Sequence, residues 1–118
     1  AYSILREAHQ LGQDVARPGI KVSDIDNAVN SYLQKSGYPI TPYSMGHGVG
    51  LRACEPPIIY RKEMMVTDTE LKEGMVIALE PETTVESHGK SFVLKLEDVF
   101  LITNSGAERL TSTEYPEI

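Results

Sequence analysis

Apolar residues recur at spacings of three and four near the start of the chain, and this pattern predicts a helix over residues 1–16. Its apolar face contains Ile4, Leu5, Ala8, Leu11 and Val15. Pro18 and Gly19 interrupt the pattern and end the helix. Because the chain opens inside a helical pattern, we expect a segment that precedes Ala1.

A second helix is predicted to follow, with Ser23 as its N-cap and acidic residues in its first turn. Its buried stripe is expected to contain Ile25, Val29, Tyr32 and Leu33. Gly37 is well placed to end this helix in a left-handed conformation, and Pro39 prevents the helix from resuming.

After Pro42 the chain changes to short segments rich in β-branched, aromatic and glycine residues, which favour an antiparallel sheet. Three strands are predicted, over residues 75–85, 92–103 and 107–110. A polar hairpin loop over residues 86–90 joins the first two strands. Two helices followed by strands make an α+β fold in a single domain, 1–118.

Composition narrows the function classes. The 118 residues carry 17 Asp and Glu against 11 Lys and Arg, a net charge of −6, and the basic residues form no cluster, so we expect no direct nucleic-acid partner. The single cysteine, Cys54, excludes an internal disulfide and a thiolate-rich zinc site. No apolar run approaches the ~20 residues that span a bilayer. No signal peptide is recognisable, and we expect a cytoplasmic protein without membrane association.

Three ionisable residues stand where the pattern otherwise predicts buried backbone: His47, Glu80 and Glu97. His47 lies between Gly46 and Gly48, where backbone crowding is least, so its imidazole can approach a metal or a substrate. Glu80 ends an apolar run just before a proline, and Glu97 lies inside a predicted strand. A buried, unpaired carboxylate costs several kcal/mol or binds a proton instead. A metal ion is one remedy, and an imidazole with carboxylates suits manganese, cobalt, iron or zinc.

Each of these residues also has a plain structural interpretation. His47 is then a turn histidine, Glu80 is an exposed strand end, and Glu97 pairs with Lys95 or Arg52. For each residue taken alone this interpretation is the better one. Only the joint occurrence of the three favours a metal site.

Three segments, taken in order, resemble the motifs of one family. They are Gly46-His47-Gly48-Val49-Gly50-Leu51 with Glu55-Pro56-Pro57, then Leu71-Lys72-Glu73-Gly74-Met75-Val76 with Glu80-Pro81, then Leu96-Glu97-Asp98. The family is the pita-bread metallopeptidases, which includes methionine aminopeptidases, Xaa-Pro aminopeptidases, prolidases and creatinase. The order and spacing most resemble the Xaa-Pro peptidase branch. The resemblance extends over nearly the whole chain, which would correspond to the C-terminal half of a pita-bread domain.

The resemblance implies a site with two divalent metal ions, bridged by a water or hydroxide that attacks the scissile carbonyl. Carried over, His47 is a terminal metal ligand, Glu80 a ligand that also accepts the proton of the water, and Glu97 a carboxylate that bridges both ions. Asp98 and Lys95 are then expected to orient Glu97.

The chain departs from the family's pattern at several positions. Two aspartate ligands of the family belong to strands that this chain does not include. Cys54 stands where a second histidine contacts the substrate, and a thiol is a weak donor. Glu82 replaces a glycine, and Lys95 replaces an arginine.

We therefore expect part of a metal-dependent, Xaa-Pro peptidase-like hydrolase that is inactive as this fragment alone. Its expected partners are a peptide or small-molecule substrate, the missing N-terminal half, and a second copy in a homodimer that covers the exposed sheet. Two alternatives stay open. One is a creatinase-like or lyase-like enzyme for a small molecule, motivated by Cys54, Glu82 and Lys95. The other is a non-catalytic peptide- or protein-binding module, against which the three joint ligands speak.

Overall fold

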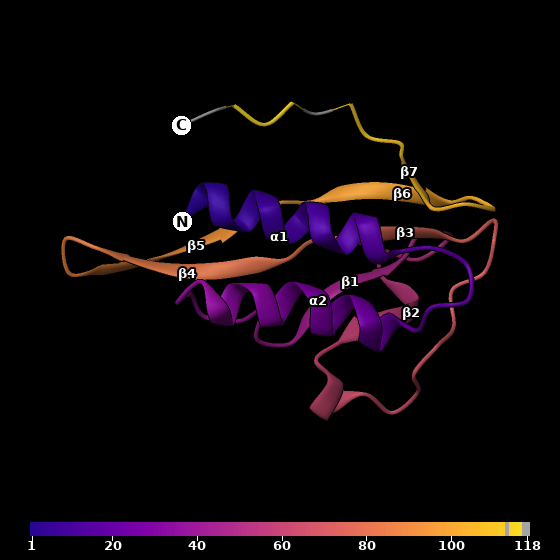
Figure 1. Ribbon diagram of the computed structural model, residues 1–118, viewed down its shortest axis with the longest axis horizontal. Coiled ribbons are helices and arrows are strands. Elements are labelled where there is room, and N and C mark those ends of the chain that lie inside the picture. The colour runs from indigo at the N-terminus through magenta and orange to yellow at the C-terminus, as the bar shows by residue number, and fades with distance from the viewer. Residues whose placement is uncertain (113, 117–118) are drawn as a thin grey trace.

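The computed structural model describes residues 1–112 and 114–116. The described residues form α1 (Tyr2–Val15), α2 (Val22–Lys35), β1 (Ser44–Gly48), β2 (Glu55–Tyr60), the short 3-10 helix η1 (Lys62–Met64), β3 (Val76–Leu79), β4 (Glu82–Ser87), β5 (Lys90–Lys95), β6 (Asp98–Ile102) and β7 (Ala107–Arg109). The two helices pack against each other and against the strands (Figure 1). The predicted α+β fold is confirmed.

The helices form for the reasons that the sequence pattern indicates. Leu5 and Ala8 of α1 are buried, and so are Ile25, Val29 and Leu33 of α2. Gly12 allows the two helices to approach closely, because a Cβ at this position would stand 3.2 Å from the Cγ2 of Val29. The apolar stripes of the two helices therefore close one side of the core.

The predicted N-cap of α2 is wrong, because the N-cap is Lys21, two residues before Ser23. The helix begins at Val22, and the N–H of Lys21 donates to Asp24 Oδ2 at 2.9 Å. Ser23 instead donates from its hydroxyl to Asp68 Oδ2 at 2.5 Å, which ties α2 to the loop before β3. The predicted end is confirmed, since Gly37 has a φ of 81°.

The larger sheet has five strands in the order β2-β1-β3-β6-β7, and each neighbouring pair is antiparallel. Strands β4 and β5 form a separate hairpin that projects beyond the helices (Figure 1). Its turn is only His88 and Gly89, both with positive φ, instead of the predicted five-residue loop. The predicted last strand is confirmed as β7.

Two of the three predicted strands are each divided in two, and two further strands were not predicted. Leu79 pairs with Asp98 at the end of the larger sheet, and Glu82 pairs with Lys95 at the start of the hairpin. Residues 80–81 and 96–97 therefore face each other across a break in both strands. Pro81 contributes to this break because it has no N–H to donate to a ladder.

The unpredicted strands, β1 and β2, have compositions that disfavour strand formation locally. β1 reads Ser-Met-Gly-His-Gly, and β2 contains two consecutive prolines. β1 is stabilised by pairing with β2 on one side and with β3 on the other. Both partners come from later in the chain, so the local sequence of β1 does not reveal them.

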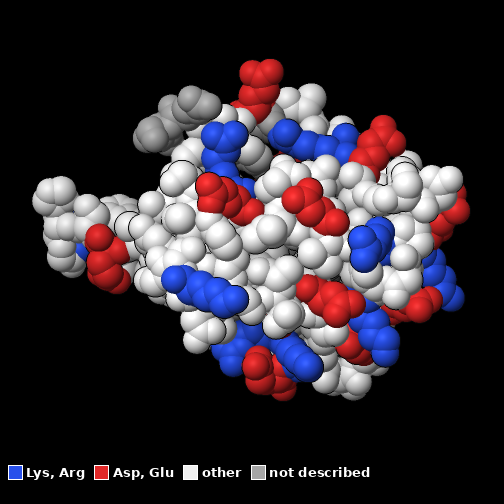
Figure 2. Space-filling view, viewed as in Figure 1, with Lys and Arg blue, Asp and Glu red and all other residues white. Residues whose placement is uncertain are grey.

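The surface carries both signs of charge. On the face seen in Figure 2, acidic and basic side chains are interspersed, and no broad patch of one sign gathers there. Among the described helices, none is both long and apolar enough to cross a bilayer.

Candidate metal site

The break between the two sheets brings His47, Glu80 and Glu97 together. Their potential ligand atoms all lie within 4.8 Å of one another, and this is the one such group of three or more His, Cys, Asp or Glu in residues 1–112 and 114–116. His47 comes from β1, whereas Glu80 and Glu97 come from opposite sides of the break. We call these three residues the triad.

The glycines beside His47 have a different role from the one predicted. A Cβ on Gly46 would collide with the carbonyl oxygen of Ala78 in β3, and a Cβ on Gly48 would collide with that of Pro56 in β2. The glycines therefore admit the neighbouring strands to β1. They fix the backbone from which the imidazole projects.

The imidazole of His47 presents one nitrogen to the two glutamates. Its Nδ1 lies 2.8 Å from the carbonyl oxygen of Gly48, which can only accept, so Nδ1 carries the proton. The lone pair of Nε2 is then free to bind a cation. Nε2 lies 3.5 Å from Glu80 Oε2.

The two carboxylates of the triad repel each other. Burial, together with the hydrogen bond to Glu80 and the charge of Glu80, raises the pKa of Glu97. A divalent ion bound between the two carboxylates would offset this repulsion. The residues present therefore fit a hard divalent cation, because one imidazole nitrogen and two carboxylates converge on one point.

Lys95 does not pair with Glu97. Its ammonium lies 3.5 Å from Glu80 Oε1 and 3.2 Å from Glu82 Oε2, and Glu82 is its direct partner across the hairpin. The expected pairing of Glu97 with Lys95 or Arg52 is therefore wrong for Lys95, and Arg52 is exposed on the loop between β1 and β2. Lys95 anchors Glu80, and Glu82 holds Lys95 in place.

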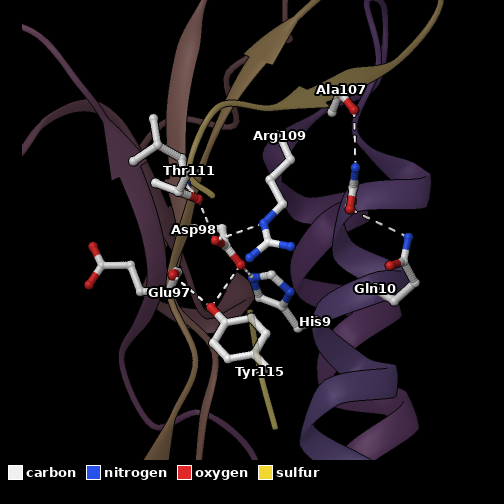
Figure 3. A network of polar contacts seen from close by, with 10 residues as sticks. His9, Gln10, Glu97, Asp98, Ala107, Arg109, Thr111 and Tyr115 are labelled. Atoms are coloured by element: carbon white, nitrogen blue, oxygen red, sulfur yellow. Dashed lines mark hydrogen bonds and ion pairs between the residues drawn. The ribbon is translucent and has the colours of Figure 1, made fainter. Parts of the chain in front are cut away.

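Asp98 faces the opposite side of the chain from Glu97 (Figure 3). Its fully buried carboxylate accepts hydrogen bonds from Arg109 Nε at 2.9 Å, from the Tyr115 hydroxyl at 2.7 Å, and from the Thr111 hydroxyl. Burial alone would raise the pKa of Asp98, but these bonds lower it. We call Asp98, Arg109, Thr111 and Tyr115 the Asp98 cluster.

The expectation that Asp98 orients Glu97 finds only an indirect counterpart. The Tyr115 hydroxyl lies 2.7 Å from Asp98 Oδ2 and 2.8 Å from the Glu97 carbonyl oxygen, so Tyr115 connects the two residues. Burial, followed by the Asp98 carboxylate, raises the pKa of Tyr115 to about 12, so this hydroxyl is protonated at neutral pH. Cys54 is exposed and lies on the loop between β1 and β2.

His9 was missed from sequence, although it lies on the buried face of α1 together with Leu5 and Gly12. Its Nε2 stands 3.5 Å from Asp98 Oδ2 and has no hydrogen-bond partner among the described residues. Burial lowers the pKa of His9, although the charge of Asp98 opposes this shift. The spacing of four from Leu5 was the one signal that could have revealed His9.

Comparisons with known proteins identify the family of this chain. Residues 1–104 match the sequence profile of metallopeptidase family M24. The Xaa-Pro dipeptidase of Pyrococcus furiosus is 38% identical over 114 residues, which are 96% of this chain and 31% of that protein. The methionine aminopeptidase of Mycoplasma capricolum is 32% identical over 125 residues, covering 94% of this chain and 50% of that protein.

Solved structures show the same relationship. The prolidase from Pyrococcus furiosus superposes with a TM-score of 0.84 at 37% identity, covering 97% of this chain and 32% of that one. The methionine aminopeptidase from Rickettsia prowazekii superposes with a TM-score of 0.76 at 30% identity, covering 91% and 49%.

The fold and the triad thus define a pita-bread domain with a candidate metal site. The chain belongs to metallopeptidase family M24. It spans about a third of the length of the Xaa-Pro dipeptidases that it matches, and corresponds to their C-terminal part.

Proposed function

We propose that this chain forms the C-terminal, metal-binding part of a peptidase that hydrolyses Xaa-Pro bonds. The observation that carries the proposal is the convergence of His47, Glu80 and Glu97 at the break between the sheets. The names of the most similar relatives, Xaa-Pro dipeptidases and a prolidase, support the substrate class.

We infer that the complete site would hold two divalent ions, for which His47, Glu80 and Glu97 would be ligands. When bound, such ions polarise the substrate carbonyl and lower the pKa of a water that attacks it. The chain's own residues then have distinct tasks. Gly48 fixes the tautomer of His47, and Lys95 holds one oxygen of Glu80 while the other faces the imidazole. Glu80 is the residue we expect to accept the proton of the water.

A second candidate is a creatinase-like or lyase-like reaction on a small molecule. Cys54 favours it, because an exposed thiol at the predicted substrate position would hold a polarised peptide carbonyl poorly. The same scaffold and the same triad would serve this reaction. Substrate preference alone separates the two candidates.

The test compares wild type with His47→Asn in the full-length protein, because this chain alone is expected to be inactive. Wild type is expected to bind Mn²⁺ or Co²⁺ and to cleave Xaa-Pro dipeptides in preference to dipeptides without proline. His47→Asn should lose at least about 100-fold in metal affinity, since a ligand is removed outright. The matched control is His88→Asn in the exposed turn of the hairpin, where asparagine tolerates the positive φ; it should bind metal as wild type does.

Three outcomes of this experiment decide between the candidates. Unchanged metal binding in His47→Asn would reject the triad. Metal binding with turnover of a small amidine or urea-like molecule, and none of dipeptides, would select the second candidate. Metal binding with dipeptide cleavage that ignores proline would retain the peptidase but reject the Xaa-Pro preference.

Two further expectations stay predictions: the cytoplasmic location and the homodimer. Phe92 and Val93 of β5 are 50% and 62% exposed and lie on opposite faces of the hairpin, so each face carries an exposed apolar side chain that a second copy or the remaining part of a longer protein would cover.

A further inference from the structure

The backbone of Glu97 is held differently from that of its neighbours. Leu96 and Glu97 lie in the break between β5 and β6, outside both strand ladders. The Leu96 N–H donates to the Pro81 carbonyl at 3.3 Å. Among the described residues, the hydrogen bond that reaches the Glu97 backbone comes from the Tyr115 hydroxyl, at 2.8 Å from the carbonyl oxygen.

Tyr115 is itself held firmly on the far side of the chain. Its hydroxyl also stands 2.7 Å from Asp98 Oδ2, so one O–H faces two acceptors on consecutive residues. Its ring lies against the Arg109 guanidinium, 5.4 Å from the ring centroid, and meets the ring of His9 edge-on at 6.1 Å. The Asp98 carboxylate is in turn fixed by Arg109 and Thr111.

We propose that Tyr115 is a positioning residue for the metal site, because its hydroxyl fastens the Glu97 carbonyl to the buried Asp98 carboxylate and so sets where the Glu97 side chain meets His47 and Glu80. This inference rests on the proposed function of the triad. It assigns a role to a C-terminal residue outside residues 1–104, which match the family profile.

The physical reason is that a ligand outside a ladder must be oriented by something else. Free rotation about the Glu97 backbone would move its carboxylate by more than the few tenths of an ångström that metal geometry tolerates. The Asp98 cluster is rigid because each acceptor oxygen meets strong donors. Because the Tyr115 hydroxyl contacts both Asp98 and the Glu97 carbonyl, it restrains the Glu97 backbone relative to the Asp98 cluster.

The experiment measures the dissociation constant of Mn²⁺ by calorimetry, and the visible absorption of bound Co²⁺, for the full-length protein. Tyr115→Phe removes only the hydroxyl and keeps the ring contacts. We expect its dissociation constant to rise about tenfold and the Co²⁺ bands to shift, as for other residues that orient a metal ligand.

Two control variants separate positioning from stability. Tyr32→Phe removes a tyrosine hydroxyl that donates to Glu7 on α1, outside the triad and the Asp98 cluster, so its dissociation constant should stay within about twofold of wild type. Tyr60→Phe removes a hydroxyl from an exposed tyrosine on β2 and should change nothing.

The outcomes distinguish this inference from the proposed function. If His47→Asn loses metal while Tyr115→Phe binds as wild type does, the triad stands and the role of Tyr115 is rejected. If Tyr32→Phe weakens binding as much as Tyr115→Phe, general destabilisation is the cause and the inference also fails. If wild type itself binds no metal, both are overturned.

Discussion

Glu97 and Asp98 are consecutive carboxylates with opposite surroundings. Asp98 is fully buried, yet its pKa is lowered, because Arg109, Thr111 and Tyr115 donate to it. Glu97 is much more exposed, yet its pKa is raised, because burial acts together with the nearby Glu80 carboxylate. Burial therefore does not by itself distinguish a structural carboxylate such as Asp98 from a candidate metal ligand such as Glu97. The presence or absence of donors does.

The largest expected effect concerns Asp98 and its role in stabilising the fold. Asp98→Asn places an amide NH₂ against at least one buried donor and removes the negative charge that accepts from Arg109. We expect the free energy of unfolding in the absence of metal to fall by about 3 kcal/mol. Chemical denaturation of wild type, Asp98→Asn and the exposed control Asp14→Asn measures this. A loss as small as that of the control would mean that the Asp98 cluster is not structural.

The next largest effect concerns Glu97 and its proposed role as a metal ligand. Glu97→Gln removes the negative charge but keeps the shape, and the dissociation constant of Mn²⁺ should rise at least about 100-fold. Without metal, its stability should equal or slightly exceed that of wild type, by a few tenths of a kcal/mol at most, because the repulsion from Glu80 is relieved.

Glu108→Gln, on the exposed strand β7, is the control for Glu97→Gln and should leave both quantities unchanged. A clear loss of metal-free stability in Glu97→Gln would show that Glu97 is a structural residue like its neighbour. The comparison would then fail.

The smallest expected effect is a pH dependence of stability that arises from His9, which lies beside Asp98. The pKa of His9 is lowered from 6.5 by burial; Asp98 opposes this shift, Arg109 supports it, and Tyr115 stays neutral nearby. The folded state therefore prefers neutral His9, while the unfolded chain takes up a proton first. Stability should fall as pH drops below the unfolded pKa, by up to about 1 kcal/mol between about pH 7.5 and about pH 5.5.

His9→Gln should flatten this dependence, and His88→Asn, in the exposed hairpin turn, should retain it. Denaturation curves at several pH values measure both. If acidification stabilised wild type relative to His9→Gln, His9 would be a charged partner of Asp98, and the Asp98 cluster would owe part of its strength to that ion pair.

The helices and the last strand could be predicted because their signals are local. Periodic apolar residues define α1 and α2, and Gly37 ends α2 as expected. β1 and β2 could not be predicted, since their glycines and prolines disfavour strands until neighbouring strands pair with them. The structure interrupts each of the two long predicted strands. Pro81 indicates where one of them ends, but it does not indicate which residues of the other strand lie opposite.

The triad was found from sequence through the joint occurrence of three ionisable residues and their resemblance to ordered motifs. The Asp98 cluster was not found, because Arg109, Thr111 and Tyr115 follow at irregular spacings and His9 lies almost ninety residues before Asp98. No local pattern connects residues so far apart.

The sequence by itself predicted His47, Glu80 and Glu97 as a joint site, and it places Glu97 and Asp98 next to each other along the chain. Neighbouring side chains along an extended chain point to opposite faces, so the sequence also indicates that Glu97 and Asp98 face different surroundings. Only the tertiary structure decided what each face meets: Glu80 and His47 on one side, Arg109 and Tyr115 on the other. The reason is physical, since the pKa and role of a carboxylate depend on the charges and donors within a few ångströms, and those come from distant segments.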